Sequence, residues 1–408
     1  MEEWKTYKLG DLVKLSSGGT PNKAKQAYWG GNIPWISAKA MYGDTISTSD
    51  LFITEEGLQN GSKLANVGST LLLTRGSGLF NHIPVCLVTA PVAYNQDVKC
   101  ITTKSHEILS DTFLYYWLFA NKAAISAILE TTGIGAGKID TQRLLNLDVL
   151  LPARHIQDHI SHICHTLFDK IALNNRINHN LEEQAQALYK SWFVDFEPFK
   201  GGKFVESELG MIPEGWSVKK AEEFCEINIG KTPPRKEHQW FSNDSSDVTW
   251  ISISDMGPSG VYISKSSEML TKEACQKFNV IIVPEGTVLL SFKLTVGRVS
   301  IAAKDLTTNE AIARFLAPTD AVRSYLYLAL KSYDYSKLGS TSSIATAVNS
   351  KIIKEMALLC PPSDIIEKFD VYVSGIFSSI KTLQNEISCL CEQRDSLLPR
   401  LMSGEITC

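Results

Sequence analysis

The sequence lacks the features of an exported or membrane-embedded chain. Its start, Met1–Lys5, has no basic flank and no apolar run, and no stretch approaches the ~20 apolar residues that span a bilayer. The nine cysteines are too scattered over 408 residues to form the disulfide framework of a small secreted domain. We therefore expect a protein of the reducing cytoplasm, with no membrane as a partner.

An excess of one charge is also missing, since 40 Lys and Arg face 44 Asp and Glu, for a net charge of −4. This balance excludes a chain coated with cations, but nucleic-acid binding depends on where basic residues lie and stays open. At ~150 residues per domain, the length predicts two or three domains. Each is large enough to bury a core without disulfides or metal.

Motifs for nucleotide binding are incomplete. The Gly-rich run Thr132–Ile139 is similar to a phosphate-binding loop, but Thr132 and Ile139 occupy positions that need Gly and Ser or Thr. The dinucleotide-binding Gly pattern fails at Lys138. We interpret the run as a flexible loop that could lie along a DNA backbone.

Metal binding is the weaker interpretation of a histidine-rich segment. Histidines at this helical spacing share a face and could hold zinc. The residues concerned are His155, His159, His162, Cys164 and His165. However, Ile156 replaces the glutamate of the zinc-protease motif, and the equivalent segment of the second half has no histidine. Cys389 and Cys391 also lack a second pair at zinc-ribbon spacing. We expect no metal and no cofactor bound by this chain.

The two halves of the chain repeat each other. Trp4 and Trp216 lie 212 residues apart, and the offset settles at 209 where Leu150–Pro152 faces Leu359–Pro361. Further matches join Gly19–Pro21 to Lys231–Pro233, Pro34–Ser37 to Thr249–Ser252, Leu71–Leu72 to Leu289–Leu290, Asn95–Gln96 to Asn309–Glu310, and Lys138–Thr141 to Ala347–Ser350. A period this long indicates duplicated domains, and the drift of the offset indicates loop insertions.

Each half is predicted to mix strands with a helix. Short apolar runs, such as Val288–Leu290 and Val299–Ala302, lie between Gly, Pro, Asn and Ser clusters, which is typical of short strands. One helix interrupts the strands in each half. It begins after a cap at Ser110–Asp111 in the first half and Thr319–Asp320 in the second.

Each half ends in a long helix with a heptad repeat. Beyond Pro152, apolar residues alternate at steps of four and three, and the same seam recurs 209 residues later, broken only by Arg394. We expect the two helices to pair with each other or with a partner; packing within one large domain is the alternative. About 40 residues at 1.5 Å each give a rod of roughly 60 Å. Asn174 and Asn178 lie on the seam, where buried amides select the register. The predicted seam includes Ile160, Leu167, Asn174, Leu181 and Leu188, with Phe369, Ile376, Leu383, Leu390 and Leu397.

Two local strings resemble the specificity subunits of type I restriction-modification systems, and the likeness covers nearly the whole chain. Trp192–Phe199, followed by Ile212–Trp216, resembles that family's central junction, and Gln393–Ile406 resembles its C-terminal end. The resemblance implies an α+β fold, with two duplicated mixed α/β target-recognition domains separated by two long antiparallel coiled-coil helices. The domains are then 1–152 (target-recognition domain 1), 153–200 (central conserved helix and junction), 201–362 (target-recognition domain 2) and 363–408 (C-terminal conserved helix).

The same resemblance implies a non-catalytic subunit that reads a bipartite, asymmetric target in double-stranded DNA. Two modification subunits would methylate adenine with S-adenosylmethionine, and restriction/translocase subunits would use ATP and Mg. The Asn-Pro-Pro-Tyr motif of amino-methyltransferases is absent from the chain. The alternatives are a self-contained DNA methyltransferase or nuclease, which would need a cofactor fold, and a coiled-coil scaffold without DNA specificity.

Candidate DNA contacts are basic or small polar residues that interrupt the short strands. Arg and Lys can bond guanine edges or phosphates, and small neighbours permit close backbone approach. We expect groove contacts from Arg75 in the first half and from Lys293 and Arg298 in the second. The full set is Lys25, Ser37, Lys39, Arg75, Ser77 and Lys138, with Arg235, Lys236, Ser254, Lys293, Thr295 and Arg298.

Overall fold

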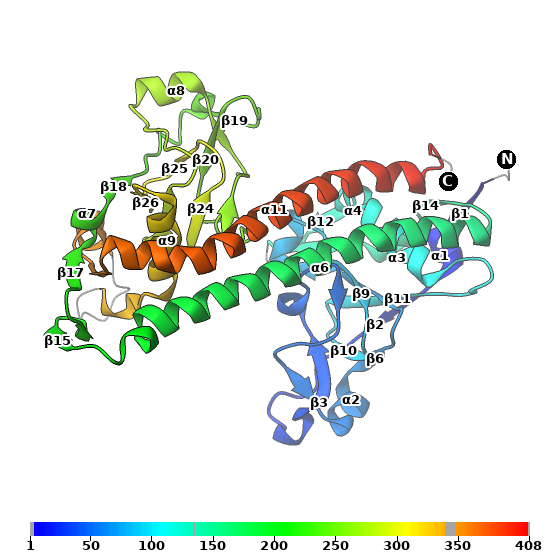
Figure 1. Ribbon diagram of the computed structural model, residues 1–408. Helices are drawn as coiled ribbons and strands as arrows, with labels where there is room; N and C mark the ends of the chain where they lie inside the picture. Colours follow the sequence, from blue (N-terminus) through cyan, green and yellow to red (C-terminus); the bar gives the residue numbers. More distant parts are fainter. Residues whose placement is uncertain (1–3, 134, 339–347, 407–408) are drawn as a thin grey trace. The chain divides into compact units, whose positions relative to one another are not determined.

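The chain folds into two compact units, each containing one of the sequence repeats (Figure 1). This computed structural model describes residues 4–133, 135–338 and 348–406. Unit 1 comprises Met1–Ala172 and Cys389–Cys408, and unit 2 comprises Leu173–Ser388. No helix in the described ranges combines the length and apolar character needed to cross a membrane.

The core of unit 1 is a five-stranded sheet in the order β2-β11-β7-β9-β4. Leu71 and Ile101 on its central strands are fully buried. The helix α3 (Asp111–Ala120) packs on this sheet and begins at Ser110, whose side chain accepts a hydrogen bond from the backbone of Phe113. The strands are β2 (Val13–Ser17), β4 (Thr45–Ile46), β7 (Thr70–Leu73), β9 (Val85–Val88) and β11 (Val98–Thr103).

Unit 2 repeats this sheet strand for strand, in the order β18-β26-β23-β24-β21. In both units the last edge strand runs parallel to its neighbour and the other pairs are antiparallel. Thr319 caps α9 (Asp320–Ser332), the counterpart of α3. The strands are β18 (Glu226–Ile229), β21 (Tyr262–Ile263), β23 (Val288–Ser291), β24 (Val299–Ala302) and β26 (Ile312–Leu316). The predicted duplication and mixed fold class are confirmed.

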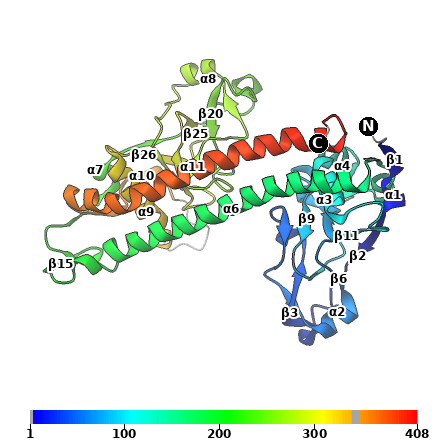
Figure 2. The same cartoon turned by 45° about the vertical axis from the view of Figure 1, so that its right-hand side comes forward.

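A smaller four-stranded sheet accompanies each large one. Unit 1 has the order β5-β3-β10-β6, with α2 (Glu55–Gly61), and unit 2 has β19-β22-β20-β25, with α8 (Lys272–Lys277). Both views show α2 and β3 at the end of unit 1 away from the long helices, and α8 at the corresponding end of unit 2 (Figures 1 and 2). The strands are β3 (Trp29–Ile36), β5 (Phe52–Ile53), β6 (Lys63–Ala65), β10 (Val92–Tyr94), β19 (Phe241–Ser242), β20 (Val248–Ile251), β22 (Met269–Leu270) and β25 (Thr307–Thr308).

The first and last strands of each repeat pair with each other. β1 (Lys5–Lys8) pairs with β14 (Asp148–Leu151), and β17 (Ser217–Lys220) pairs with β27 (Ala357–Cys360), both antiparallel. Unit 1 adds a small sheet of β8 (Arg75–Gly76), β13 (Gly137–Ile139) and β12 (Leu129–Thr131), and unit 2 adds the hairpin of β15 (Phe204–Ser207) and β16 (Gly210–Pro213). Ala347 and Ile134, which belong to two sequence patterns noted above, lie outside the described residues.

The expectation of one helix per half was wrong, because each half also contains shorter helices. They are α1 (Leu9–Leu12), α4 (Lys122–Ser126), α5 (Thr141–Leu145), α7 (Ala221–Phe224) and α10 (Ser350–Lys354), besides α2 and α8. One or two turns are too short to show a helical period in the sequence, and isolated helices of this length are unstable, so tertiary packing forms them.

The long helices α6 (Arg154–Phe193) and α11 (Ser363–Met402) both run through both units. In unit 1, Ile160 of α6 shares a core with Leu401 of α11. In unit 2, the Phe193 and Phe369 rings meet edge to face with centroids 4.8 Å apart, and Asn174 donates a hydrogen bond to Glu386 at 2.8 Å. In these pairs the residue number falls along α11 as it rises along α6. Phe168 and Arg394, whose side chains also meet in unit 1, fit the same order, so the helices are antiparallel within each unit.

The predicted seam is only part of the buried surface of these helices. Of the ten seam residues named above, Ile160, Asn174 and Phe369 are buried and seven are partly exposed: Leu167, Leu181, Leu188, Ile376, Leu383, Leu390 and Leu397. Aromatic residues beside the seam, Phe168 on α6 and Phe377 on α11, are buried as well. The ring centroids of Phe168 and Tyr116 lie 5.2 Å apart, and those of the counterpart pair, Phe377 and Tyr327, lie 5.6 Å apart. The globular part of each unit therefore packs on the flank of the helix pair.

Candidate nucleic-acid interface

Four basic side chains gather in unit 1 and are called the basic cluster: Lys63, Arg75, Lys99 and Lys138. Arg75 on β8 pairs in register with Lys138 on β13. Burial, and then the charges of Arg75 and Lys63, lower the pKa of Lys99, although Asp97 acts in the opposite direction. A group of cations placed close together favours a bound anion such as phosphate.

Hydroxyl groups on strand β2 hold two members of the basic cluster. Lys63 donates to Ser16 at 3.2 Å, and Lys99 donates to Ser17. Both lysines were missed from the sequence, because they lie on β6 and β11 and only the fold brings these strands to β2. The alternation of β11, which places Lys99 on the face opposite the buried Val98 and Cys100, was the available signal.

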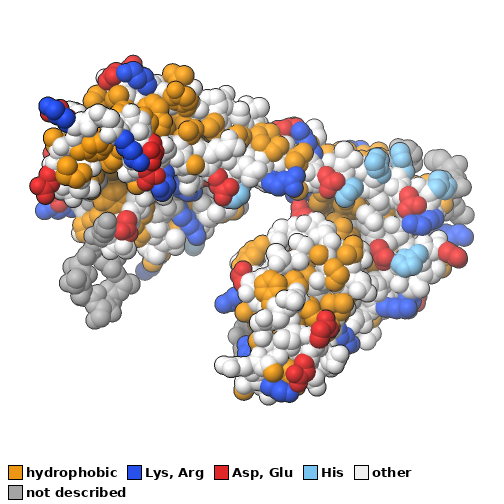
Figure 3. Space-filling model, turned by 60° about the horizontal axis from the view of Figure 1, so that its bottom comes forward, with side chains coloured by type: hydrophobic (Ala, Val, Ile, Leu, Met, Phe, Trp, Pro, Cys, Tyr) orange, Lys and Arg blue, Asp and Glu red, His pale blue; other side chains and the backbone are white. Residues whose placement is uncertain are grey.

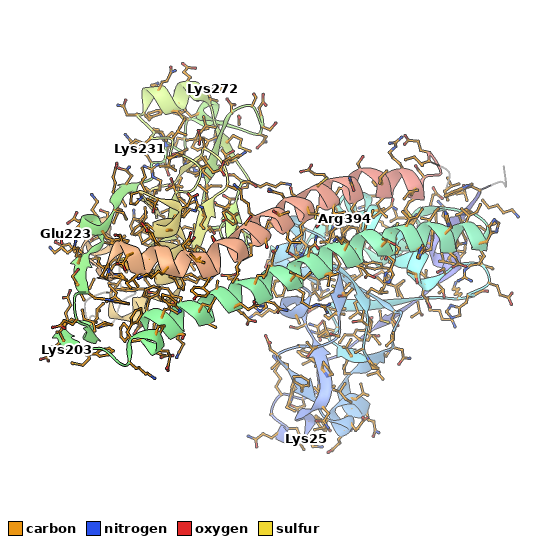
Figure 4. All side chains as sticks on the ribbon, in the orientation of Figure 1. Lys25, Lys203, Glu223, Lys231, Lys272 and Arg394 are labelled. Atoms are coloured by element: carbon orange, nitrogen blue, oxygen red, sulfur yellow. The ribbon has the colours of Figure 1, made fainter. Side chains whose placement is uncertain are left out.

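The other candidates of unit 1 lie in three places. Ser77 begins the 3-10 helix η3 (Ser77–Phe80), two residues after Arg75, and so lies beside the basic cluster. Ser37 precedes η2 (Ala38–Ala40), which contains the exposed Lys39. Lys25 lies at the far end of the unit (Figure 4) and bonds Glu56 and the Tyr28 hydroxyl, each at 2.9 Å. These two bonds, the Tyr28 bond being the larger cause, raise the pKa of Lys25.

In unit 2, three candidates share the loop between β23 and β24. Lys293 and Thr295 are exposed, and the Ser291 hydroxyl donates to the Thr295 carbonyl at 2.6 Å. Arg298 instead turns inward and donates to the carbonyl of Ile253 at 2.6 Å. This bond attaches the loop to the segment of Ser254, whose hydroxyl lies 2.6 Å from that of Ser252.

Arg235 and Lys236 lie together on a second loop of unit 2. Arg235 pairs with Glu268 at 2.6 Å and lies over the rings of Phe241 and Trp250, at 4.3 and 4.5 Å from their centroids. Lys236 is exposed. Lys231, at the start of this loop (Figure 4), donates to the carbonyl of Phe278 at 2.6 Å.

A buried cation lies in the same unit and was missed from the sequence. Arg314 on β26 is 1% exposed and donates to the carbonyls of Ile229 and Ile281, each at 2.8 Å. Burial lowers its pKa to about 10. Its bonds fix β26 to two neighbouring segments, so Arg314 is a structural cation rather than a surface contact.

The exposed histidines of α6 do not converge on a metal site. His165 pairs with Asp169 at 3.1 Å, whereas Cys164 is buried. Within the described ranges, no group of three or more His, Cys, Asp or Glu residues is arranged to hold a metal ion. Figure 3 shows histidine side chains gathered on one part of the face drawn there, with basic and acidic side chains interspersed elsewhere.

Two units with the same sheet order, both packed on one pair of long helices and both bearing exposed basic loops, define a duplicated two-domain protein. The chain belongs to the family of type I restriction modification DNA specificity domains, whose model matches residues 1–183 and again 213–388. Members of this family are non-catalytic specificity subunits that recognise DNA, and partner subunits perform catalysis.

Relatives match along the full length of the chain. The type I restriction enzyme MjaIX specificity subunit of Methanocaldococcus jannaschii is 27% identical, covering 99% of this chain and 94% of the relative. The HindI specificity subunit of Haemophilus influenzae is 25% identical over 100% of both chains. A crystal structure of a type I restriction-modification S subunit from M. genitalium has the same fold, with a TM-score of 0.56 at 12% identity, covering 98% of this chain and 96% of that one.

Proposed function

We propose that this chain reads a bipartite, asymmetric target in double-stranded DNA, with one half-site for each unit. The observation that carries the proposal is that one sheet order occurs twice with different side chains on corresponding loops. Arg75 and Ser77 follow β7 in unit 1, whereas Lys293 and Thr295 follow its counterpart β23 in unit 2. Two similar readers with different contact residues suit a target whose halves differ.

The proposal assigns chemistry to partner subunits. Two modification subunits would methylate an adenine in each half-site with S-adenosylmethionine, and restriction/translocase subunits would use ATP and Mg. The chain itself would bind no cofactor. The nine cysteines without a disulfide framework favour the reducing cytoplasm as the place of assembly. Membership of a non-catalytic family argues against the alternative of a self-contained methyltransferase or nuclease.

The test is to express the chain with the modification subunits of its own system and map methylated adenines by single-molecule sequencing. We expect one motif with two different halves separated by a fixed spacer. The chain alone, given S-adenosylmethionine, should transfer no methyl group. Methylation by the isolated chain, or a continuous palindromic motif, would contradict the proposal.

Single substitutions then assign the half-sites to the units. Arg75→Ala should weaken or relax recognition of one half-site only, and Lys293→Ala the other only, because a base contact is worth ~1–3 kcal/mol of discrimination. Binding to oligonucleotides mutated in one half-site, at fixed salt, gives the comparison. Lys203→Ala, beside β15 (Figure 4), is the matched control and should change neither half-site. If Arg75→Ala and Lys293→Ala bind every oligonucleotide as the parent does, these residues are not base contacts.

A further inference from the structure

Each unit contains the same arrangement of two adjacent loops, which we call the loop pair. In unit 1 it consists of Gly18–Thr20 and Asn95–Asp97, and in unit 2 of Gly230–Thr232 and Asn309–Ala311. The backbone of Gly19 donates to Tyr94 at 2.9 Å, and that of Lys231 donates to Thr308 at 2.9 Å. The same main-chain bond thus joins the first loop to the end of the strand that leads into the second loop in each unit.

Two more bonds of the loop pair recur in both units. The Trp35 indole donates to the Gly19 carbonyl at 3.0 Å, and the Trp250 indole donates to the Lys231 carbonyl at 3.2 Å. The amide oxygen of Asn95 accepts from Asp97, and that of Asn309 accepts from Ala311, each at 3.1 Å.

Glycine is required at the same place in each loop pair. A Cβ added to Gly18 would lie 2.0 Å from the carbonyl oxygen of Tyr94, and one added to Gly230 would lie 2.0 Å from that of Asn309. Backbone atoms cannot move aside for a side chain there. The framework of the loop pair is therefore the same in both units.

The exposed side chains on this framework differ. In unit 1, Thr20 donates to the side-chain oxygen of Gln96 at 2.6 Å, which leaves the NH2 group of Gln96 free to donate. In unit 2, Thr232 donates to one carboxylate oxygen of Glu310, which leaves the other oxygen free to accept. Gln96 and Glu310 are both exposed. An amide and a carboxylate thus occupy equivalent, oriented positions.

Basic residues border each loop pair. In unit 1, the Asn95–Asp97 loop leads into β11 and its Lys99, and Lys63 bonds Ser16 just before Gly18. In unit 2, Lys231 belongs to the loop pair itself. A phosphate backbone held by these cations would bring base edges to the adjacent loops.

Building on the proposed function, we propose that Gln96 and Glu310 are corresponding base-reading residues, Gln96 for adenine and Glu310 for cytosine. Glutamine can donate to N7 of adenine and accept from its N6 amino group, whereas a carboxylate can only accept and suits the N4 amino group of cytosine. The same position in the two readers then specifies different base pairs, which makes the target asymmetric.

The experiment exchanges the two functional groups in the complex with modification subunits. Gln96→Glu should change one base position of one half-site from adenine toward cytosine, and Glu310→Gln should make the reverse change in the other. We expect preference for the original base to fall about 5- to 150-fold, while all other positions stay as in the parent. The measurements are oligonucleotide binding and the sequence of the methylated motif.

Matched controls carry the same charge changes at exposed sites of the same units. Gln142→Glu lies on α5, and Glu223→Gln lies on α7 (Figure 4). Both should leave base preference unchanged. Gln96→Ala and Glu310→Ala provide a second route, because each should lose preference at the same single position.

The outcomes separate the two proposals. Suppose that the four variants of Gln96 and Glu310 keep the parent's base preference at every position, or bind all sequences more weakly to the same extent. Gln96 and Glu310 then do not read bases and the inference is wrong. The proposed function would then still stand on the two-part motif of the parent complex. A parent complex without such a motif would instead overturn the proposed function.

Discussion

Arg394 occupies an apolar position of the heptad repeat, and its surroundings in unit 1 give the reason. Its guanidinium lies 3.6 Å from the carboxylate of Asp44 and 5.1 and 5.3 Å from the ring centroids of Phe119 and Phe168. Only 14% of the side chain is exposed. Arg394 (Figure 4) therefore attaches α11 to unit 1 through a charge and two rings.

From the sequence alone, Arg394→Leu would repair the heptad and stabilise the helix pair. The structure predicts the opposite, a loss of about 2 kcal/mol, because Asp44 loses its guanidinium partner and two cation–π contacts disappear. Hydrogen exchange of the α3 amides in unit 1 measures the change. Arg400→Leu, which removes only an exposed pair with Glu405, should cost less than about 0.5 kcal/mol. If Arg394→Leu were as stable as the parent or more stable, the buried Asp44 would not need the Arg394 guanidinium as a partner.

The defect of Arg394→Leu should grow with pH. Burial raises the pKa of Asp44 above its ordinary value of 3.8, although the charges of Arg394 and Lys122 lower it. A carboxyl group with a raised pKa in the folded state contributes stability at low pH that is lost as the pH rises through that pKa. Removing Arg394 raises the pKa of Asp44 further, so the variant should lose stability relative to the parent as the pH rises above the ordinary carboxyl pKa of 3.8. Adding Asp44→Asn should abolish that slope.

Leu294 combines a strained backbone with full exposure. Its φ is 60°, a region that L residues rarely adopt, and the residue is 99% exposed. Leu294→Gly should stabilise unit 2 by about 0.5–1 kcal/mol, because relief of strain exceeds the entropy that glycine loses. Leu294→Ala keeps the strain and serves as the control. Thermal unfolding measures both, and a Leu294→Gly variant less stable than Leu294→Ala would contradict the assignment.

At the scale of elements, a side chain closes the exposed edge of the large sheet in unit 2. Gln384 of α11 accepts from the backbone N–H of Tyr262 at 2.9 Å and donates to its carbonyl at 3.1 Å. These are the bonds that a neighbouring strand would make to β21. An edge covered in this way cannot pair with another chain.

Removing this amide should loosen β21 without unfolding unit 2. Gln384→Ala loses two hydrogen bonds, worth about 0.5–1.5 kcal/mol each. The amide of Tyr262 should then exchange with solvent about tenfold faster, as measured by hydrogen exchange. Asn385→Ala, at the exposed next position of α11, is the control and should leave the rate unchanged. An unaltered rate in Gln384→Ala would mean that the sheet alone protects this amide.

Elements that depend on local sequence were predicted, and those that depend on distant pairing were not. The caps at Ser110 and Thr319 start α3 and α9 as expected, because a cap acts within one turn. The sequence could not show that β8 pairs with β13, which brings Arg75 beside Lys138. It also could not show that Arg298 turns inward to Ile253, because that contact depends on the fold of both segments.

At the scale of the whole molecule, the two long helices pass without a break from one unit to the other. Inserting seven residues into each, after Ala172 and after Ser388, would keep the heptad phase and add roughly 10 Å at 1.5 Å per residue. At 3.4 Å per base step, the spacer of the methylated motif should lengthen by about three base pairs. The same insertion in the exposed turn between β15 and β16 is the control. An unchanged spacer in a fully active variant would show that the helices do not set the distance.

Unit 1 is completed by residues that follow Cys389, although its other part ends at Ala172. A ribosome must therefore synthesise all of unit 2 before Arg394, Leu398 and Leu401 exist to cover the aromatic surface of α3 and α6. At a synthesis rate of roughly 5–20 residues per second, this surface stays uncovered on the order of 10–40 s before the end of α11 is made. We therefore expect the first repeat to expose this aromatic surface on the nascent chain for that interval, which favours chaperone binding.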